Sequence, residues 1–369
     1  MILDLHIPTR VLFGRGRITE LGRVTAELGG AALLVCGRNS ARATGLLASV
    51  EATLHAAKVS TVLFDRVSPD PRSDEADAAV ALAAATGCEV VIGLGGGSAI
   101  DTAKAVAAGL RHGPVGPLVA TTLPDDPLTP VIAVPTTAGS GAEVTKGAII
   151  TDVDRGLKSG IRGAALFPHT ALIDPTASGT ATPTLARDAG FDALAHAVEG
   201  YVARRANPLT RHWAEQALHL IAHRLPHFVA GDTSPEILDD LALAALLGGF
   251  NVATASTCLP HRLQQALGSV IPITHGRGLA LVYPAWLETA YPHAPSAFDT
   301  IATLLGSPDP HHAITRLLTD TGITGRLRDH SLTPAHLPTV IAAVTGNTEN
   351  DPIPHPDPDT YHTILEASL

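Results

Sequence analysis

Two residues in the second half of the chain have the types and the spacing of metal ligands. Asp192 and His196 are four positions apart in the segment DALAHAVEG, so a helix would place both on one face. A carboxylate and an imidazole so placed can bind one divalent metal ion. A hydrogen bond between the two side chains within the helix is the alternative interpretation.

Two further histidines could complete such a site. His261 and His275 lie in the segments PHRLQQALG and ITHG. Gly268 and Pro272 should break any helix between them, so the chain can bend back and bring both imidazoles together. Two unrelated histidines are the alternative, because the chain contains 18 histidines against four lysines.

A glycine-rich loop, residues 95–98 (GGGS), lies between an apolar run and a helical pattern. Backbone N–H groups of glycines can approach a phosphate closely, and the helix N-terminus favours negative charge. An ordinary tight turn is the alternative, but the strand-before and helix-after context favours a dinucleotide pyrophosphate. The chain has neither the GxGxxG fingerprint nor a Walker motif, which disfavours ATP chemistry.

A second loop, residues 135–145 (PTTAGSGAEVT), also follows a strand-like run. Its small hydroxyl residues alternate with glycine, so the loop could line a cofactor. It could equally be a polar connection to the apolar run at residues 148–150.

The elements that must position these loops alternate along the first half of the chain. Short apolar runs at residues 31–36, 59–64, 90–94 and 131–134 predict strands, and helical patterns over residues 41–57, up to 85 and up to 109 follow the first three. Strand, loop and helix in succession predict a doubly wound parallel sheet, whose strands are apolar on both faces.

The second half has few strand-like runs and reads as helical. The predicted helices span residues 185–204, 208–223, 235–246, 310–321 and, after a proline-rich segment, 360–368. We therefore expect an α/β domain over residues 1–180 and an all-α helical domain over residues 181–369, in keeping with a length of 369 residues.

Composition excludes several classes of protein. A net charge of −10 argues against nucleic-acid binding, and 45% hydrophobic with 16% charged residues excludes disorder. The chain contains no run of 18 apolar residues, so no membrane span is predicted. The N-terminus also lacks a signal pattern, so we expect a cytoplasmic protein. Three scattered cysteines form neither a disulfide framework nor a CxxC zinc site.

In this order and spacing, the motifs resemble the iron-containing (group III) alcohol dehydrogenases, which belong to the dehydroquinate-synthase-like superfamily. The matching segments are VLFG at 11–14, GGGSAIDTAK at 95–104, PTTAGSGAEVT at 135–145, DALAHAVEGY at 192–201, and His261 followed by THG at 274–276. The resemblance covers essentially the whole chain from about residue 8.

The resemblance implies a dinucleotide-binding α/β domain and a helical metal-binding domain, with the active site in the cleft between them. It implies that one divalent metal, Fe²⁺ or Zn²⁺, is held by Asp192, His196, His261 and His275. The residues expected to contact the nicotinamide cofactor are Gly37, Arg38, Asn39, Asp70, Gly95, Gly96, Gly97, Ser98, Asp101, Thr136, Thr137, Ser140 and Lys158.

The implied reaction is hydride transfer that interconverts an aldehyde or ketone and the corresponding alcohol. The metal would act as a Lewis acid on the substrate oxygen, and the nicotinamide would carry the hydride. Two alternatives stay open. One is reduction of an acidic keto compound, as in maleylacetate reductases, although that branch often replaces the first metal ligand, which here is Asp192. The other is a synthase or lyase of the same superfamily.

The chain departs from the family pattern at two places. Gln265 lies four residues after His261, at a position near the nicotinamide where many members of the family have a histidine. Glutamine does not titrate, so a proton relay through this position is in doubt. Next to His261, Arg262 either points to the surface or helps to bind an anionic substrate.

The second departure follows the strand at residues 31–36. NAD-preferring members often place an aspartate there, whereas this chain has Gly37 followed by Arg38 and Asn39. Without the carboxylate, and with an arginine nearby, a ribose 2′-phosphate would be tolerated, so we expect NADP(H) rather than NAD(H). The family also implies a homodimer and a small aldehyde, alcohol or keto-acid substrate.

Overall fold

The computed structural model describes residues 5–369. Residues 1–4 lie outside the described residues; they belong to the predicted N-terminal domain and to the N-terminus that was expected to lack a signal pattern. By its internal contacts the chain divides into two compact units. The N-terminal unit comprises Ile7–Thr137 and Ala142–Thr180, and the helical unit comprises Ala138–Gly141 and Ala181–Leu369 with the described part of Met1–His6.

The N-terminal unit is built on a parallel sheet of six strands in the order β1-β8-β5-β4-β2-β3. These strands are β1 (Arg10–Phe13), β2 (Ala31–Gly37), β3 (Ser60–Val67), β4 (Val90–Gly95), β5 (Val131–Pro135) and β8 (Thr170–Ile173). Its helices are α1 (Leu21–Ala26), α2 (Ser40–Ala43), α3 (Leu46–Ala56), α4 (Ser73–Thr86), α5 (Gly97–His112) and α6 (Val115–Leu118).

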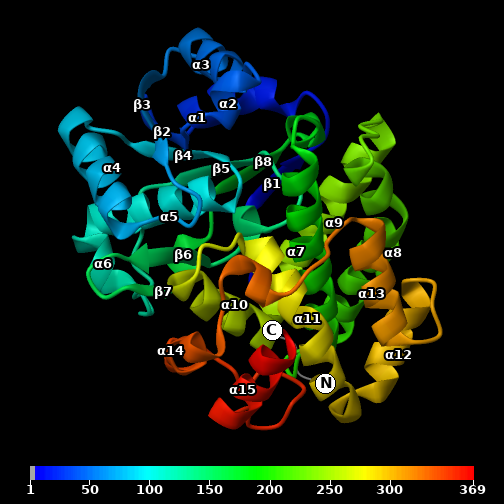
Figure 1. The fold of residues 1–369 in the computed structure, drawn as a ribbon. Coiled ribbons are helices and arrows are strands. Elements are labelled where there is room, and N and C mark those ends of the chain that lie inside the picture. The colour runs from blue at the N-terminus through cyan, green and yellow to red at the C-terminus, as the bar shows by residue number, and fades with distance from the viewer. Residues whose placement is uncertain (1–4) are drawn as a thin grey trace. The chain divides into compact units, whose positions relative to one another are not determined.

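Alternation of side chains along β2 explains why helices cover both faces of this sheet. Leu34 and its even-numbered neighbours pack with Leu21 of α1 and Val50 of α3, whereas Leu33 and Val35 pack against α4 and α5. Figure 1 shows the two sets of helices on opposite faces. The doubly wound parallel sheet predicted from the sequence is therefore confirmed.

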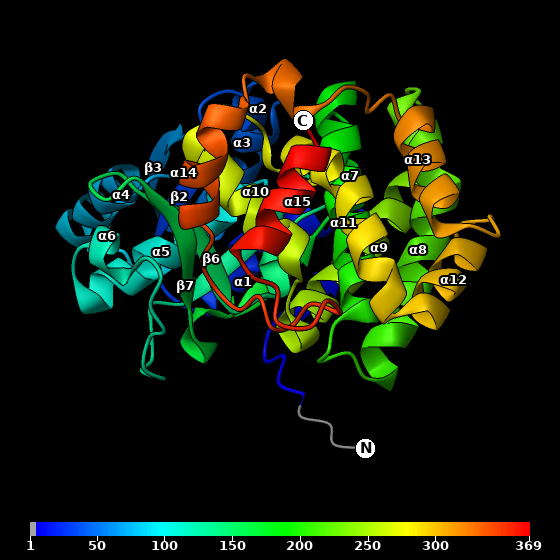
Figure 2. The same cartoon turned by 60° about the horizontal axis from the view of Figure 1, so that its bottom comes forward.

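The local predictions in this unit need two corrections. Residues 41–57 do not form one helix, because the chain breaks between α2 and α3 at Gly45, whose φ of 76° suits glycine. The sequence reading also missed an antiparallel hairpin, β6 (Gly147–Asp152) with β7 (Leu157–Arg162), which is visible in Figure 2.

The helical unit contains α7 to α15. These are α7 (Pro183–Val202), α8 (Pro208–Val229), α9 (Pro235–Ala255), α10 (Leu259–Val270), α11 (His275–Ala290), α12 (Pro295–Leu304), α13 (Pro310–Asp320), α14 (Leu337–Ala342) and α15 (Pro358–Ala367). Short 3₁₀ helices complete the two units: η1 (Arg17–Glu20), η2 (Ala142–Val144), η3 (Ala164–Leu166), η4 (Pro175–Ser178), η5 (Tyr291–His293), η6 (Leu327–His330) and η7 (Pro334–His336).

Proline residues mark the starts of most helices in this unit. Most of them start with proline at the first or second helical position, where its missing N–H costs nothing. At α8 the Asn207 side chain also accepts the N–H groups of Leu209 and Thr210, and Thr210 completes a capping box. The all-α character predicted for the second half is confirmed.

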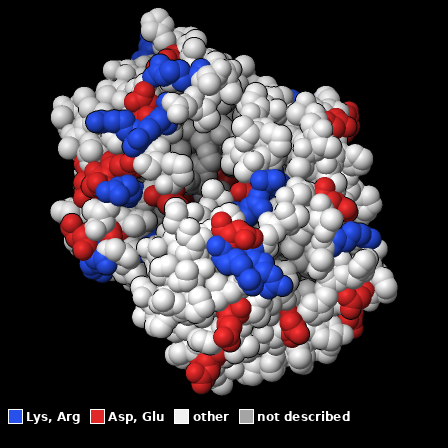
Figure 3. Space-filling view, in the orientation of Figure 1, with Lys and Arg blue, Asp and Glu red and all other residues white. Residues whose placement is uncertain are grey.

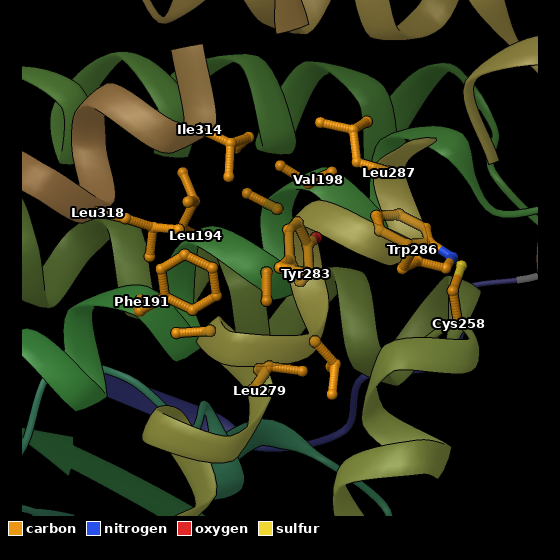
Figure 4. Close-up of a cluster of buried hydrophobic side chains, with 14 of the residues drawn as sticks. Phe191, Leu194, Val198, Cys258, Leu279, Tyr283, Trp286, Leu287, Ile314 and Leu318 are labelled. Atoms are coloured by element: carbon orange, nitrogen blue, oxygen red, sulfur yellow. The ribbon is translucent and has the colours of Figure 1, made fainter. Parts of the chain in front are cut away.

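Aromatic side chains form the centre of the helical unit. Phe191 of α7 meets Tyr283 of α11 edge to face with ring centroids 5.2 Å apart, and Tyr283 lies 4.9 Å from Trp286. Figure 4 shows these rings with the surrounding aliphatic side chains and the sulfur of Cys258 beside Trp286. This core fixes α7 against α11, two helices that carry site residues.

Among the described residues, only α9 is long and apolar enough by length and composition to cross a membrane. Most of its apolar stretch is buried inside the helical unit, where α9 packs against α7 and α8. One helix of this length and composition is weak evidence for a membrane span.

Candidate functional site

The four predicted metal ligands come from three helices of the helical unit. Asp192 and His196 lie one turn apart in the buried middle of α7, His261 is the third residue of α10, and His275 is the first residue of α11. The bend that joins α10 to α11 lies at residues 271–274, which include Pro272. The expectation that Gly268 breaks the helix is wrong, because Gly268 lies inside α10.

The three imidazoles converge on one carboxylate oxygen. Asp192 Oδ1 lies 3.6 Å from Nε2 of His196, 3.4 Å from Nε2 of His261 and 3.3 Å from Nε2 of His275. The rings of His196 and His261 stack with centroids 4.7 Å apart. The ligand atoms of Asp192, His261 and His275 all lie within 4.8 Å of one another, as the ligands of a single ion must.

The far nitrogen of each ring has its own partner. Nδ1 of His261 lies 2.8 Å from the carboxylate of Glu199, Nδ1 of His275 contacts Oε1 of Gln264, and Nδ1 of His196 lies 3.3 Å from the carbonyl oxygen of Gly139. Since each of these partners accepts a hydrogen bond, each ring can donate to it from Nδ1. A neutral ring that does so presents the lone pair of Nε2 to the shared centre, which is the tautomer that a metal ligand needs.

Within the described part of the chain, Oδ1 of Asp192 and Nε2 of His261 at this centre have no hydrogen-bond partner. A buried polar atom without a partner is costly unless something binds it. One carboxylate and three neutral imidazoles are also the donors that iron(II) and zinc accept. The residues present therefore fit a divalent metal.

The electrostatics of the centre favour a positive charge there. Burial alone would raise the pKa of Asp192, yet the facing imidazoles hold it well below its usual value. Burial lowers the pKa of His196 to about 4, which keeps that ring neutral. Burial also opposes a charge on His261, but the carboxylates of Glu199 and Asp192 outweigh it and raise the pKa of His261 to about 9.

Sequence reasoning quoted Glu199 within a motif but gave it no role, and it did not consider Gln264. Glu199 is fully buried, seven residues after Asp192 and three after His196, so one face of α7 carries all three side chains. Gln264 follows His261 by three residues on α10. Glu199 and Gln264 each lie three residues after a predicted ligand on the same helix, and this spacing could have identified them from the sequence.

Gln265 and Arg262 are both buried, at 5% exposure each. The guanidinium of Arg262 donates to Oγ1 of Thr257 at 2.8 Å and to Oε1 of Gln265 at 3.4 Å. The interpretation that Arg262 points to the surface is therefore wrong. Gln265 lies one turn after His261 on α10, so the two side chains share a helix face.

The predicted cofactor loops lie at the carboxyl ends of adjacent strands in the N-terminal unit. Residues 95–98 run from the last residue of β4 into the first turn of α5, and residues 135–137 run from the last residue of the neighbouring strand β5 into the loop that follows it. The two loops touch, because the amide of Thr136 donates to the carbonyl of Gly95 and a Cβ on Gly96 would lie 3.3 Å from Oγ1 of Thr137. Gly95 has a φ of 152°, which only glycine adopts readily.

Two other predicted cofactor residues meet each other in the same unit. Nζ of the buried Lys158 on β7 forms an ion pair with Oδ1 of Asp70, which has a positive φ of 57° before α4. Asp101 on α5 accepts the amide of Ile149 at 2.9 Å, so its carboxylate ties α5 to β6.

The residues expected near the ribose follow β2. Arg38 has an exposed side chain that lies 3.4 Å from Glu75 and 3.4 Å from Oγ of Ser68, and Gly37 ends the strand. Asn39 is the N-cap residue of α2. Ser140 belongs to the short segment Ala138–Gly141 that groups with the helical unit.

Comparison with known proteins matches nearly the whole chain to one family. Residues 8–175 match the profile "Iron-containing alcohol dehydrogenase" and residues 186–368 match its C-terminal domain profile. The chain is 30% identical to the 1,3-propanediol dehydrogenase of Klebsiella pneumoniae over 95% of both chains. It is 31% identical to the NAD-dependent methanol dehydrogenase of Bacillus methanolicus over 74% of this chain and 72% of that protein.

A solved structure gives the same result. The crystal structure of a 1,3-propanediol oxidoreductase superposes with a TM-score of 0.94 at 28% identity over all of both chains. The resemblance inferred from the motifs is thereby confirmed. The chain belongs to the iron-containing alcohol dehydrogenase family, and its activity is that of a metal-dependent alcohol dehydrogenase or aldehyde reductase linked to a nicotinamide cofactor.

Proposed function

We propose that Asp192, His196, His261 and His275 hold the divalent metal of this enzyme, and that the ion is Fe²⁺ or Zn²⁺. The observation that carries this proposal is the convergence of three Nε2 atoms on one buried carboxylate oxygen, each ring being oriented through its own Nδ1 partner. When bound there, the metal supplies a Lewis acid for the oxygen of an aldehyde, ketone or alcohol.

The protein residues set how that chemistry proceeds. Burial of Asp192 and His261 excludes bulk water from the ligand atoms, which strengthens their electrostatic interaction with a cation. Gln265 cannot release a proton, so the proton exchanged with the substrate passes through solvent rather than through this side chain. Hydride comes from the nicotinamide.

The metal proposal is tested by removal and by substitution. We expect chelation to abolish NADPH-dependent reduction of an aldehyde, and added Fe²⁺ or Zn²⁺ to restore it. The His261→Ala enzyme should bind the metal more weakly than wild type and lose at least about 10³-fold in kcat/KM. Metal content and kinetics check both expectations, and full activity in this variant would refute the ligand set.

We propose the residues 1–180 as the dinucleotide-binding domain and residues 181–369 as the metal-binding domain. Within the first, the proposed cofactor contacts are Gly37, Arg38, Asn39, Asp70, Gly95, Gly96, Gly97, Ser98, Asp101, Thr136, Thr137 and Lys158, joined by Ser140. The touching loops after β4 and β5 support a pyrophosphate site there, because glycine lets backbone N–H groups approach a phosphate.

We propose NADP(H) as the preferred cofactor. Gly37 leaves the end of β2 without a carboxylate, and the exposed guanidinium of Arg38 can pair with a ribose 2′-phosphate. Comparison of kcat/KM for NADPH and NADH tests this. Gly37→Asp should lower the NADPH value by at least about tenfold and change the NADH value by less than about threefold, and an unchanged ratio would contradict the assignment.

Three further properties are proposed for the whole protein. We expect a small aldehyde or alcohol as substrate, since the relatives named above act on 1,3-propanediol and methanol. We also expect a homodimer and a cytoplasmic location. A substrate screen with both cofactors after metal loading, light scattering of the purified chain and cell fractionation test these expectations separately.

A further inference from the structure

We propose that Glu199 is a positioning residue that sets the affinity of the metal centre by holding both the ring of His261 and the start of the helix that carries it. This inference rests on the proposed metal ligands. It concerns a side chain that is not itself a ligand.

The carboxylate of Glu199 faces two N–H donors at once. Both of its oxygens lie 2.8 Å from Nδ1 of His261, and Oε2 also accepts the backbone N–H of Cys258 at 2.6 Å. Cys258 is the N-cap residue of α10, and its side chain caps nothing there. Glu199 on α7 thus accepts one of the backbone N–H groups that the start of α10 leaves without a partner in the helix, and it also contacts the ligand ring three residues later.

A carboxylate presents only accepting oxygens to these two donors. An amide in its place has one accepting oxygen and one donating NH₂ group. If the NH₂ faced Nδ1, His261 would move its proton to Nε2 and lose the lone pair that it turns toward Asp192. If the NH₂ faced Cys258, two donors would oppose each other at a fully buried position.

The other two rings have weaker partners. Nδ1 of His275 contacts the neutral amide of Gln264, and Nδ1 of His196 lies 3.3 Å from a backbone carbonyl. A charged acceptor polarises an imidazole more strongly than a neutral one, so His261 is the ligand whose orientation and basicity are most strongly set. Glu199 should therefore be the most sensitive position around the ligands.

A second buried carboxylate supplies a matched control. Asp351 accepts the N–H of Leu259, the first residue of α10, at 2.8 Å, and also accepts Nε1 of Trp286. It therefore supports the same helix start as Glu199 and is just as buried, yet no hydrogen bond joins it to His261. Asp351→Asn tests the loss of a buried carboxylate at this helix start without touching the ring.

The experiment compares Glu199→Gln with Asp351→Asn in the full-length protein. Zinc affinity is measured by competition with a chromophoric chelator, and the metal-free unfolding midpoint is measured in parallel. We expect Glu199→Gln to weaken zinc binding by about 10- to 100-fold. Asp351→Asn should lower the metal-free midpoint and leave the zinc affinity within about threefold of wild type.

Equal zinc affinities of Glu199→Gln and wild type would overturn the proposal, as would equal losses in Glu199→Gln and Asp351→Asn. If Glu199→Gln does not fold, Glu199→Asp replaces it. That variant keeps the charge, but its shorter side chain cannot reach both donors, so it should show a smaller upward shift of the midpoint on zinc addition than wild type. An unchanged shift would count against the proposal.

A failure of the proposed function gives a different result. If the wild-type chain bound no zinc at one equivalent, or if Asp192→Ala bound it equally well, the ligand set itself would be wrong. A wild type that binds one zinc through Asp192, with Glu199→Gln indistinguishable from it, would overturn the positioning role alone. Absorption of the Co²⁺-substituted protein adds a spectroscopic readout, because a displaced His261 changes the ligand geometry.

Discussion

Single residues in this protein act through their burial as much as through their type. Burial lowers the pKa of His196, whereas at Asp192 and His261 the facing groups outweigh burial, so the pKa of Asp192 is lowered and that of His261 is raised. The exposed histidines His219 and His223 of α8 instead contact each other, with ring centroids 4.4 Å apart, and Nδ1 of His223 lies 2.8 Å from the carbonyl oxygen of His219.

Buried charge also occurs away from the metal centre, in the N-terminal unit. Nζ of the fully buried Lys104 donates to Oγ1 and the carbonyl of Thr145 and to the carbonyl of Gly147, and it lies 3.8 Å from Asp101. Burial lowers the pKa of Lys104, and burial raises the pKa of the nearby Glu143 to about 7.

The raised pKa of Glu143 predicts a defined pH dependence. Because the folded-state pKa is above the unfolded value of 4.5, its stabilising contribution is complete below pH 4.5 and is lost as the pH rises to about 7. The free energy of unfolding of wild type relative to Glu143→Gln should therefore fall by up to about 3 kcal/mol across that window. Urea denaturation at several pH values measures this difference, and parallel curves for the two proteins would contradict it.

At the scale of elements, the site depends on where three helices begin and how closely they approach. α11 begins with His275, and the next residue, Gly276, packs directly on the backbone of α7. The Thr274 hydroxyl donates to the Asp188 carboxylate at 2.8 Å, which fixes the same junction.

This close approach predicts a severe effect of one added methyl group. In Gly276→Ala the new Cβ would lie 2.0 Å from the carbonyl oxygen of Asp188, so α11 must move away from α7 and carry His275 with it. We expect a loss of at least about 2 kcal/mol in the free energy of unfolding together with weaker zinc binding.

Gly278→Ala is the comparison for this prediction. Its Cβ would lie 3.2 Å from Cγ of the Gln264 side chain, which can shift, so its loss of stability should be smaller. Denaturant unfolding with and without zinc measures both variants. Equal stability of Gly276→Ala and wild type would show that the helices are not held at this distance.

At the scale of the whole molecule, the proposed ligands divide between the two units. All four proposed metal ligands belong to the helical unit, whereas the proposed cofactor residues 95–98 and 135–137 belong to the N-terminal unit. The charged side chains of the face drawn in Figure 3 are of both signs and often adjacent, and no broad basic field covers that face.

Because the two proposed sites lie in different units, zinc and NADPH should each protect a different set of backbone amides from hydrogen exchange. In hydrogen exchange, zinc should slow the amides of α7 and of the first turns of α10 and α11, and NADPH should slow the amides at the start of α5. Asp192→Ala should lose the zinc effect and keep the NADPH effect. Loss of both effects in this variant would contradict the assignment of the two ligands to different units.

Much of this fold could be predicted from the sequence because the relevant signals are local. Apolar runs on both faces predicted the strands β2 to β5, and the helical spacing predicted α7 to α9. The break between α2 and α3 and the β6–β7 hairpin were missed, since one depends on a single glycine and the other on pairing between two short strands.

The sequence by itself determined the family and the four residues that could bind a metal, because their types and order are properties of the chain. Only the tertiary structure decided which side chains orient them. Glu199 contacts His261 across 62 positions, and Asp351 supports the same helix start from 92 positions away from Leu259. Spacing within one helix cannot specify such partners, because the packing of separate helices determines which buried donor each carboxylate reaches.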